Sequence, residues 1–143
     1  MNPLKIKLRL DYIGTGKPSK IFGGKSAEQL AEENRQHKVS LMRNVPIQGI
    51  RIDEIDMSQE IYFVLDEITG KSIAYAPVLI TFYADGIEDA IKFSMKEEFR
   101  TVEVLEPEKM EFTRYEIERL LFKVSEELGE YKEYLVRKMN NWK

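Results

Sequence analysis

Residues 72–105, SIAYAPVLITFYADGIEDAIKFSMKEEFRTVEVL, decide the fold because they combine a strand, a helix and a second strand in one stretch. Residues 72–84 are the most apolar run of the chain, residues 86–98 carry apolar side chains at helical spacing, and residues 100–105 predict a short strand. Pro77 has no N–H to donate, so we expect a bulge or a sheet edge there. A strand, a helix and a strand in this order predict a right-handed crossover between parallel strands.

The N-terminal part of the chain predicts a strand followed by a helix. Residues 4–12 alternate apolar and charged, mostly basic, side chains, which is typical of a half-buried strand with a basic outer face. Ser26 and Gln29 form a capping box that begins a helix reaching about Lys38. The apolar stripe of this helix is thin, so we expect it to lie on the surface.

Two further strands are expected at residues 48–56 and 59–68. Residues 60–65 are apolar on both faces, which indicates an interior strand. Residues 69–71, Thr-Gly-Lys, then form a hairpin turn in which the glycine is available for a positive φ.

The resulting order, β-α-β-β-β-α-β-α, predicts one α+β domain over residues 1–143. We expect a mixed, mostly antiparallel sheet of about four to five strands with helices packed on one face, as in a ferredoxin-like sandwich, and a long C-terminal helix. Residues 78–105 resemble, in fold pattern, the second half of RNA-recognition-motif domains. The aromatic-glycine signature of those domains is absent around Tyr75 to Phe82. The resemblance therefore implies a fold pattern and no RNA-binding residue.

Residues 113–141 predict one long C-terminal helix that is also a candidate assembly element. Thr113 and Glu116 fit a capping box at its start. Apolar side chains then recur at spacings of three and four, as in a coiled-coil seam, and the expected self-association residues are Leu121, Val124, Leu128, Tyr131 and Leu135. Gly129 lies inside this run and can bend or break the helix. The stripe fits packing on the protein's own sheet as well as pairing between copies, and the sequence leaves both open.

Composition restricts the class of protein. The chain has no cysteine, which excludes disulfides, thiolate zinc sites and cysteine nucleophiles. It has neither a signal peptide nor an apolar run of about 18 residues that would predict a membrane span, so we expect a cytoplasmic protein with no membrane partner. A charged fraction of 33% is typical of thermophilic proteins.

The distribution of charge along the chain indicates which classes of partner the protein binds. The net charge of −3 disfavours nucleic acid, although the basic strand residues Lys5, Lys7 and Arg9 leave it as an alternative. Residues 1–25 are basic and residues 45–70 are acidic, so the two segments can attract each other within the fold or between subunits.

The loop of residues 14–26 is the main candidate for an anion site. Glycines let backbone N–H groups approach an anion, and the following helix N-terminus adds a partial positive charge. The expected ligand-binding residues are Lys17, Lys20, Gly23, Gly24, Lys25 and Ser26. The stretch ends like a P-loop, but Ser19 stands where that motif requires its first glycine. The alternative is a solvated loop in which Ser26 is only a helix cap.

Other chemistry-bearing residues give weaker signals. Asp53, Asp56 and Glu60 supply the oxygen ligands that Mg²⁺ or Ca²⁺ takes, but their spacing matches no EF-hand loop, and a charged sheet edge explains them as well. His37, the single histidine, is expected near the end of the first helix, where it would complement the helix dipole. We predict no metal, no cofactor and no catalytic residue.

These observations predict a small protein that works by binding or regulation without catalysis and that associates with itself or with another protein. The alternative is a binder of a small phosphorylated molecule or nucleotide, or an enzyme acting on one, that uses the loop of residues 14–26.

Overall fold

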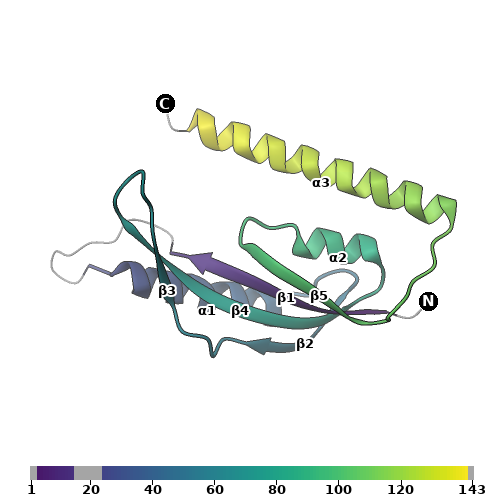
Figure 1. The fold of residues 1–143 in the computed structure, drawn as a ribbon, viewed down its shortest axis with the longest axis horizontal. Helices are drawn as coiled ribbons and strands as arrows, with labels where there is room; N and C mark the ends of the chain where they lie inside the picture. Colours follow the sequence, from purple (N-terminus) through teal and green to yellow (C-terminus); the bar gives the residue numbers. More distant parts are fainter. Residues whose placement is uncertain (1–2, 15–23, 142–143) are drawn as a thin grey trace.

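The computed structural model describes residues 3–14 and 24–141, and a five-stranded sheet forms its centre (Figure 1). The elements are β1 (Leu4–Ile13), α1 (Ala27–Asn44), β2 (Ile50–Asp56), β3 (Tyr62–Leu65), β4 (Ser72–Ala84), α2 (Ile87–Ser94), β5 (Phe99–Glu106) and α3 (Arg114–Asn140). The predicted α+β class, element order and long C-terminal helix are confirmed.

The strands lie in the order β2-β4-β1-β5, and β3 pairs with the other end of β4. β1 is antiparallel to β4 and β5, while β2 and β3 are antiparallel to β4. β4 and β5 therefore run parallel, as expected for a crossover, but β1 lies between them. Neighbouring strands of the described sheet are all antiparallel, so the sheet is less mixed than expected. The order is that of a ferredoxin-like βαββαβ sandwich, to which β3 and α3 are added.

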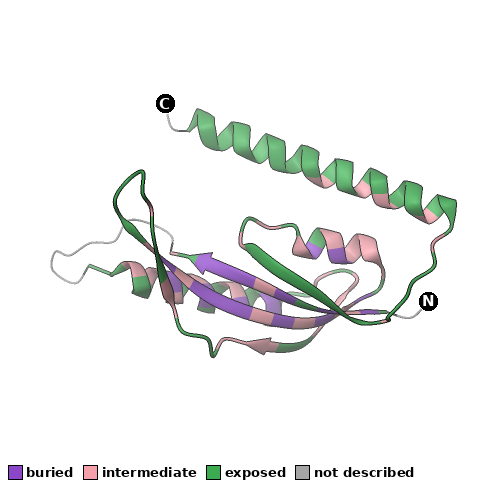
Figure 2. Cartoon of the chain, in the orientation of Figure 1, coloured by how far each residue is buried: buried purple, intermediate pink, exposed green. Residues whose placement is uncertain are grey.

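The hydrophobic core lies on one face of the sheet. Alternate residues of β1 and β4 point to this face, and those with no exposed surface include Leu8, Leu10, Val78, Ile80 and Phe82. Val39 of α1 and Phe93 of α2 belong to the same cluster, so both helices cover this face. Phe93 meets Phe82 edge to face with ring centroids 4.8 Å apart. Figure 2 shows buried residues concentrated in β1 and β4, with β5 and α3 exposed.

α1 continues to Asn44, past the expected end at Lys38. The prediction of a surface helix with a thin apolar stripe is wrong, because the buried residues of α1 are Ala31, Arg35, Val39 and Met42. Their spacings of four, four and three form one stripe that runs into the additional turns. α1 therefore covers both β4 and β1.

The sheet edge beside β4 consists of two strands with a gap between them. β2 pairs with β4 as far as Leu79, and β3 begins pairing at Tyr75. Pro77 lies in this gap, where its missing N–H costs no ladder hydrogen bond, so its predicted position at an edge is confirmed. Arg35 spans the gap, because its Nη1 donates to the carbonyls of Gln59 at 2.9 Å and Pro77 at 3.1 Å.

β3 is an edge strand, so the expectation of an interior strand is wrong. It pairs with β4 alone, and Phe63, Val64 and Leu65 are exposed. Apolar residues on both faces match the pattern of a buried strand, but β3 has a neighbouring strand on one side only. The hairpin turn before β4 is as expected, with Gly70 at a φ of 70° and its N–H donating to the carbonyl of Asp66 at 2.7 Å.

Candidate self-association surface

α3 begins at the predicted cap and lies on α2 as an outer layer (Figure 1). Thr113 Oγ1 accepts a hydrogen bond from the backbone N–H of Glu116 at 3.1 Å, and the Glu116 carboxylate accepts one from the N–H of Thr113 at 3.4 Å. The half-buried residues of the helix are Glu116, Leu120, Lys123 and Glu127. Their spacing places them on one side of α3, and this mostly polar side is the least exposed. Arg119 of α3 donates to Glu88 of α2 at 3.1 Å.

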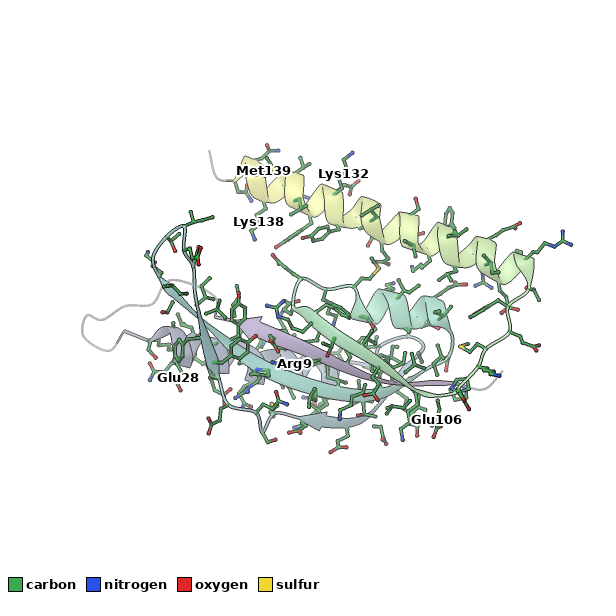
Figure 3. All side chains as sticks on the ribbon, in the orientation of Figure 1. Arg9, Glu28, Glu106, Lys132, Lys138 and Met139 are labelled. Carbon is green, nitrogen blue, oxygen red and sulfur yellow. The ribbon has the colours of Figure 1, made fainter. Side chains whose placement is uncertain are left out.

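The C-terminal half of α3 is held by exposed polar contacts. The Tyr134 hydroxyl donates to Glu97 at 3.4 Å, and Lys138 Nζ lies 3.6 Å from the same carboxylate. Figure 3 shows Lys138 pointing from α3 towards the rest of the protein, whereas Lys132 points away. Exposed pairs of this kind contribute about 0 to 1 kcal/mol each, so they position the helix but anchor it weakly.

A cavity of about 380 Å³ lies under this half of α3. Its lining includes Tyr12 from β1, Lys96 from the segment after α2, and Tyr131 and Tyr134 from α3. Lys96 is half-buried, and this burial lowers the pKa of its ammonium group. The cavity shows that α3 is not packed closely against the body of the protein here.

The predicted seam of α3 is exposed along its whole length. None of the residues of α3, all of which the structure describes, is buried. The exposed fractions of the seam residues lie between 39% for Val124 and 64% for Leu121, and the set includes Leu128, Tyr131 and Leu135. The seam therefore does not pack on the protein's own sheet, which was one of the two alternatives left by the sequence.

α3 is continuous through Gly129, so the bend or break that this residue allows is not present (Figure 1). A Cβ atom built at Gly129 would meet no atom within 4 Å, which shows that the position faces open space. The apolar seam consequently runs without interruption on both sides of this residue.

Acidic and basic residues are unevenly distributed along α3. Residues 116–130 contain five acidic and two basic residues, whereas residues 131–140 contain three basic and one acidic residue. Some of the charge is paired within the helix: Lys123 Nζ lies 3.1 Å from Glu126, and this hydrogen bond raises the pKa of Lys123. The helix is thus net acidic over residues 116–130 and net basic over residues 131–140.

β5 is a second exposed apolar element, which the sequence reasoning did not assign to a surface. Val102 and Val104 pair with Leu8 and Ile6, so they lie on the core face of the sheet. They are nevertheless about half exposed, at 49% and 54%, because α1 and α2 cover other strands. The only sequence signal was the alternation of these valines with Glu103, which is also typical of an ordinary half-buried strand.

The predicted anion site falls partly outside the described residues. Lys17, Lys20 and Gly23 belong to that part, so the structure does not test whether the six residues come together. Of the remaining residues, Gly24 is exposed, Lys25 Nζ lies 2.7 Å from Glu33, and Ser26 Oγ accepts from the N–H of Gln29 at 3.2 Å. The hydroxyl and the ammonium thus have partners in α1, and the anion site stays a prediction.

The acidic segment and the histidine are separate from this surface. Hydrogen bonds from the side chain of Ser58 and from its backbone N–H, the latter at 2.8 Å, lower the pKa of Asp56. Within residues 3–14 and 24–141, no three carboxylate or histidine side chains are grouped so that they could hold a metal ion. His37 lies in the interior of α1 and is exposed, and the expected position near the helix end is wrong because the helix extends to Asn44.

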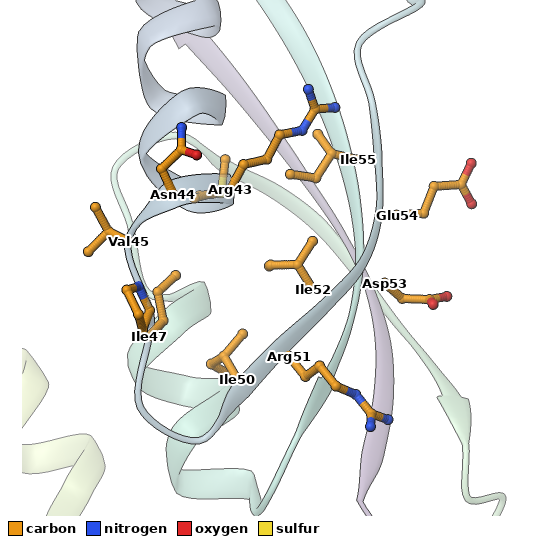
Figure 4. A pocket seen from close by; sticks show the side chains of 12 residues that line it. Arg43, Asn44, Val45, Ile47, Ile50, Arg51, Ile52, Asp53, Glu54 and Ile55 are labelled. Atoms are coloured by element: carbon orange, nitrogen blue, oxygen red, sulfur yellow. The ribbon is translucent and has the colours of Figure 1, made fainter.

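A groove of about 660 Å³ lies between the end of α1 and β2 (Figure 4). Ile47, Ile50, Ile52 and Ile55 line it, and they also pack against the main core. In Figure 4 the carboxylates of Asp53 and Glu54 point away from the groove. The groove is therefore an apolar margin of the core, and its charged residues lie at the rim.

Comparison with protein-family models, curated proteins and solved structures found no match to this chain. Among the helices in the described part of the chain, none is both long and apolar enough to span a membrane.

Proposed function

We propose that this protein is a non-catalytic interaction or regulatory domain that forms a homodimer through α3. The observation that carries the proposal is a helix of 27 residues that buries none of them and exposes five regularly spaced apolar side chains. Contiguous exposed apolar surface of this kind marks interaction sites in soluble proteins. Helices in proteins gain most of their stability from packing an apolar face, so α3 is expected to pack its exposed seam against a partner.

The spacing of the seam favours a second copy of this chain as the partner. Side chains at alternating spacings of three and four interdigitate with the same pattern on another helix. A twofold interface uses the same surface patch on both subunits, so one seam is sufficient to form it.

Charge disfavours a parallel arrangement of the two α3 helices. A parallel pair would place the acidic residues 116–130 of both helices side by side and the basic residues 131–140 of both helices side by side, which costs free energy. An antiparallel pair centred near Leu128 keeps the two basic segments apart.

The proposal is tested by the solution mass of the purified chain, measured by light scattering on a sizing column. We expect the wild-type chain to have the mass of a dimer. Leu121→Glu and Leu128→Glu each place a charge in the seam, and we expect each to weaken the dimer by at least about 30-fold, or roughly 2 kcal/mol.

Phe122→Glu is the matched control, because Phe122 is also apolar and exposed but lies on another side of α3. We expect this variant to remain a dimer. A monomeric wild-type chain at high concentration contradicts the proposal. Equal weakening by all three substitutions would show that the seam is not the contact surface.

A further inference from the structure

Asp11 is a buried carboxylate on the sheet face opposite the helices. Asp11, Lys7 and Arg9 are odd-numbered residues of β1 and share the face of the sheet opposite the core. The even-numbered residues of this strand point into the core. The side chain of Asp11 is only 1% exposed although no helix covers this face in the described structure. Burial of an ionised carboxylate requires charged and hydrogen-bonded partners.

Three side chains from three strands provide these partners. Arg9 of β1 holds Asp11 with two donors, Nε at 3.0 Å and Nη2 at 3.3 Å. The hydroxyl of Tyr62 on β3 donates to the same carboxylate. Arg100 of β5 approaches it with Nε at 3.4 Å. The sheet order brings them together, because β1 lies next to β5 and is separated from β3 only by β4.

Two stacked tyrosines support the arginines. The rings of Tyr62 and Tyr75 lie 5.4 Å apart at an angle of 21°. The Arg100 guanidinium lies 5.1 Å from the centroid of Tyr75, and that of Arg9 lies 6.0 Å from the centroid of Tyr62. Stacking and ion pairing together fix the orientation of both guanidiniums.

The group carries a net positive charge at an accessible place. Two guanidiniums share one carboxylate, and among the described residues Asp11 is the only carboxylate within 4 Å of either arginine. The arginine side chains remain 33% and 38% exposed. Arg9 uses Nε and Nη2 on Asp11, and Arg100 uses Nε on Asp11 and Nη1 on the carbonyl of Phe99. These contacts involve neither Nη1 of Arg9 nor Nη2 of Arg100.

We propose that Arg9 and Arg100 form a binding site for a phosphate group on the open face of the sheet, with Asp11 as the residue that positions them. The guanidinium fork matches phosphate geometry, and a phosphate monoester carries enough charge to interact with both arginines. Binding to groups that are already oriented loses less conformational entropy than binding to free side chains. The ligand is a small phosphorylated molecule. This site is separate from α3 and does not depend on the dimer.

The site is tested by NMR titration of the intact chain at low ionic strength, with inorganic phosphate in one arm and a nucleoside monophosphate in the other. We expect saturable shifts of the Arg9 and Arg100 Nε resonances with both probes. Tighter binding of the nucleotide assigns a role to its nucleoside part, whereas equal affinity assigns binding to the phosphate alone; both results support the site.

Arg100→Gln is the decisive variant. Arg100 lies on an edge strand and is partly exposed, so we expect the chain to fold normally without its guanidinium. We expect this variant to weaken phosphate binding by about tenfold or more while the rest of the spectrum stays native. Arg51→Gln is the matched control, since Arg51 lies 4.5 Å from the Tyr83 ring centroid on the same sheet face, and we expect its affinity to be unchanged. Absence of saturation in the wild-type chain, or equal weakening in both variants, overturns the proposal.

Discussion

Arg35 lies in the interior of the protein, and its guanidinium replaces hydrogen bonds that the sheet backbone cannot make. Its Nη1 joins the carbonyls of Gln59 and Pro77 across the gap between β2 and β3. Glu32, one turn earlier in α1, accepts from Nε at 2.6 Å and balances the charge. A single side chain therefore connects α1 to β4 and to the segment between β2 and β3.

We expect Arg35→Met to lower the free energy of unfolding by about 2 to 3 kcal/mol, because the methionine removes the donor from the buried carbonyl of Pro77 and from the carbonyl of Gln59. Chemical denaturation at neutral pH measures this loss. Arg43→Met, in the exposed last turn of the same helix, is the control and should change the value by about 0.5 kcal/mol or less. A similar small effect of Arg35→Met would show that water satisfies these carbonyls.

Tyr12 makes the free energy of unfolding decrease as the pH rises into the alkaline range. Burial raises the pKa of its hydroxyl above the ordinary value of 10.0. Above about pH 10 the unfolded chain releases this proton while the folded chain retains it, so the unfolded state is favoured as the pH rises. The contribution is a loss of roughly 1 kcal/mol between pH 8 and pH 11.

The Tyr12→Phe variant lacks this proton, so we expect its stability to fall less than that of the wild-type chain over the same range. Denaturant unfolding of both chains at pH 8 and pH 11 gives the difference. Tyr115→Phe, at an exposed residue of α3, should follow the wild-type chain. Identical pH dependence of all three chains would contradict the assignment to Tyr12.

At the scale of elements, α3 differs from the other helices because it lies outside the core. α1 and α2 contribute residues to the buried cluster, whereas α3 rests on α2 through a mostly polar stripe and exposes its seam. The βαββαβ sandwich therefore contains its hydrophobic core without α3.

We expect a chain that ends at residue 112 to remain folded and to be monomeric. Removing α3 takes away no buried residue, and it removes the proposed dimer surface completely. Far-UV circular dichroism should retain the sheet signal with less helix, and light scattering should give the monomer mass. An unfolded product would show that α3 belongs to the core, and a folded dimer would place the interface elsewhere, for example on β5.

For the whole molecule, dimerisation predicts that thermal stability depends on protein concentration. Raising the concentration of the intact chain from about 1 to about 100 μM should favour the folded dimer by up to about 2.7 kcal/mol and raise the Tm by several degrees. The chain that ends at residue 112 should show a constant Tm over this range. A constant Tm for the intact chain would contradict the dimer.

A helix or strand could be predicted well where the residues that specify it lie close together in the sequence. The bounds of β4 agree with the expected residues 72–84, because a long apolar run identifies a central strand on its own. The end of α1 and the edge position of β3 were not predicted, because both depend on which surface each segment contacts. β3 has the composition of an interior strand, and only the sheet order shows that it has one neighbour.

The candidate sites show the same division. The seam of α3 is visible in the sequence because its residues lie three and four positions apart on one helix. The group around Asp11 is not visible there, because Tyr62 is 51 residues away and Arg100 comes from β5. Only the alternation of Arg9 and Asp11 on one strand face hints at it.

The sequence alone determined the types and order of the elements, the capping of α1 and α3, the hairpin turn and the apolar seam, because each depends on contacts within a few residues. Only the tertiary structure decided that β1 lies between β4 and β5, that Arg35 closes the gap at the sheet edge, and that the seam of α3 remains exposed. These features depend on pairing between distant segments, whose free energy arises only when burial and hydrogen bonding across the whole sheet are satisfied together.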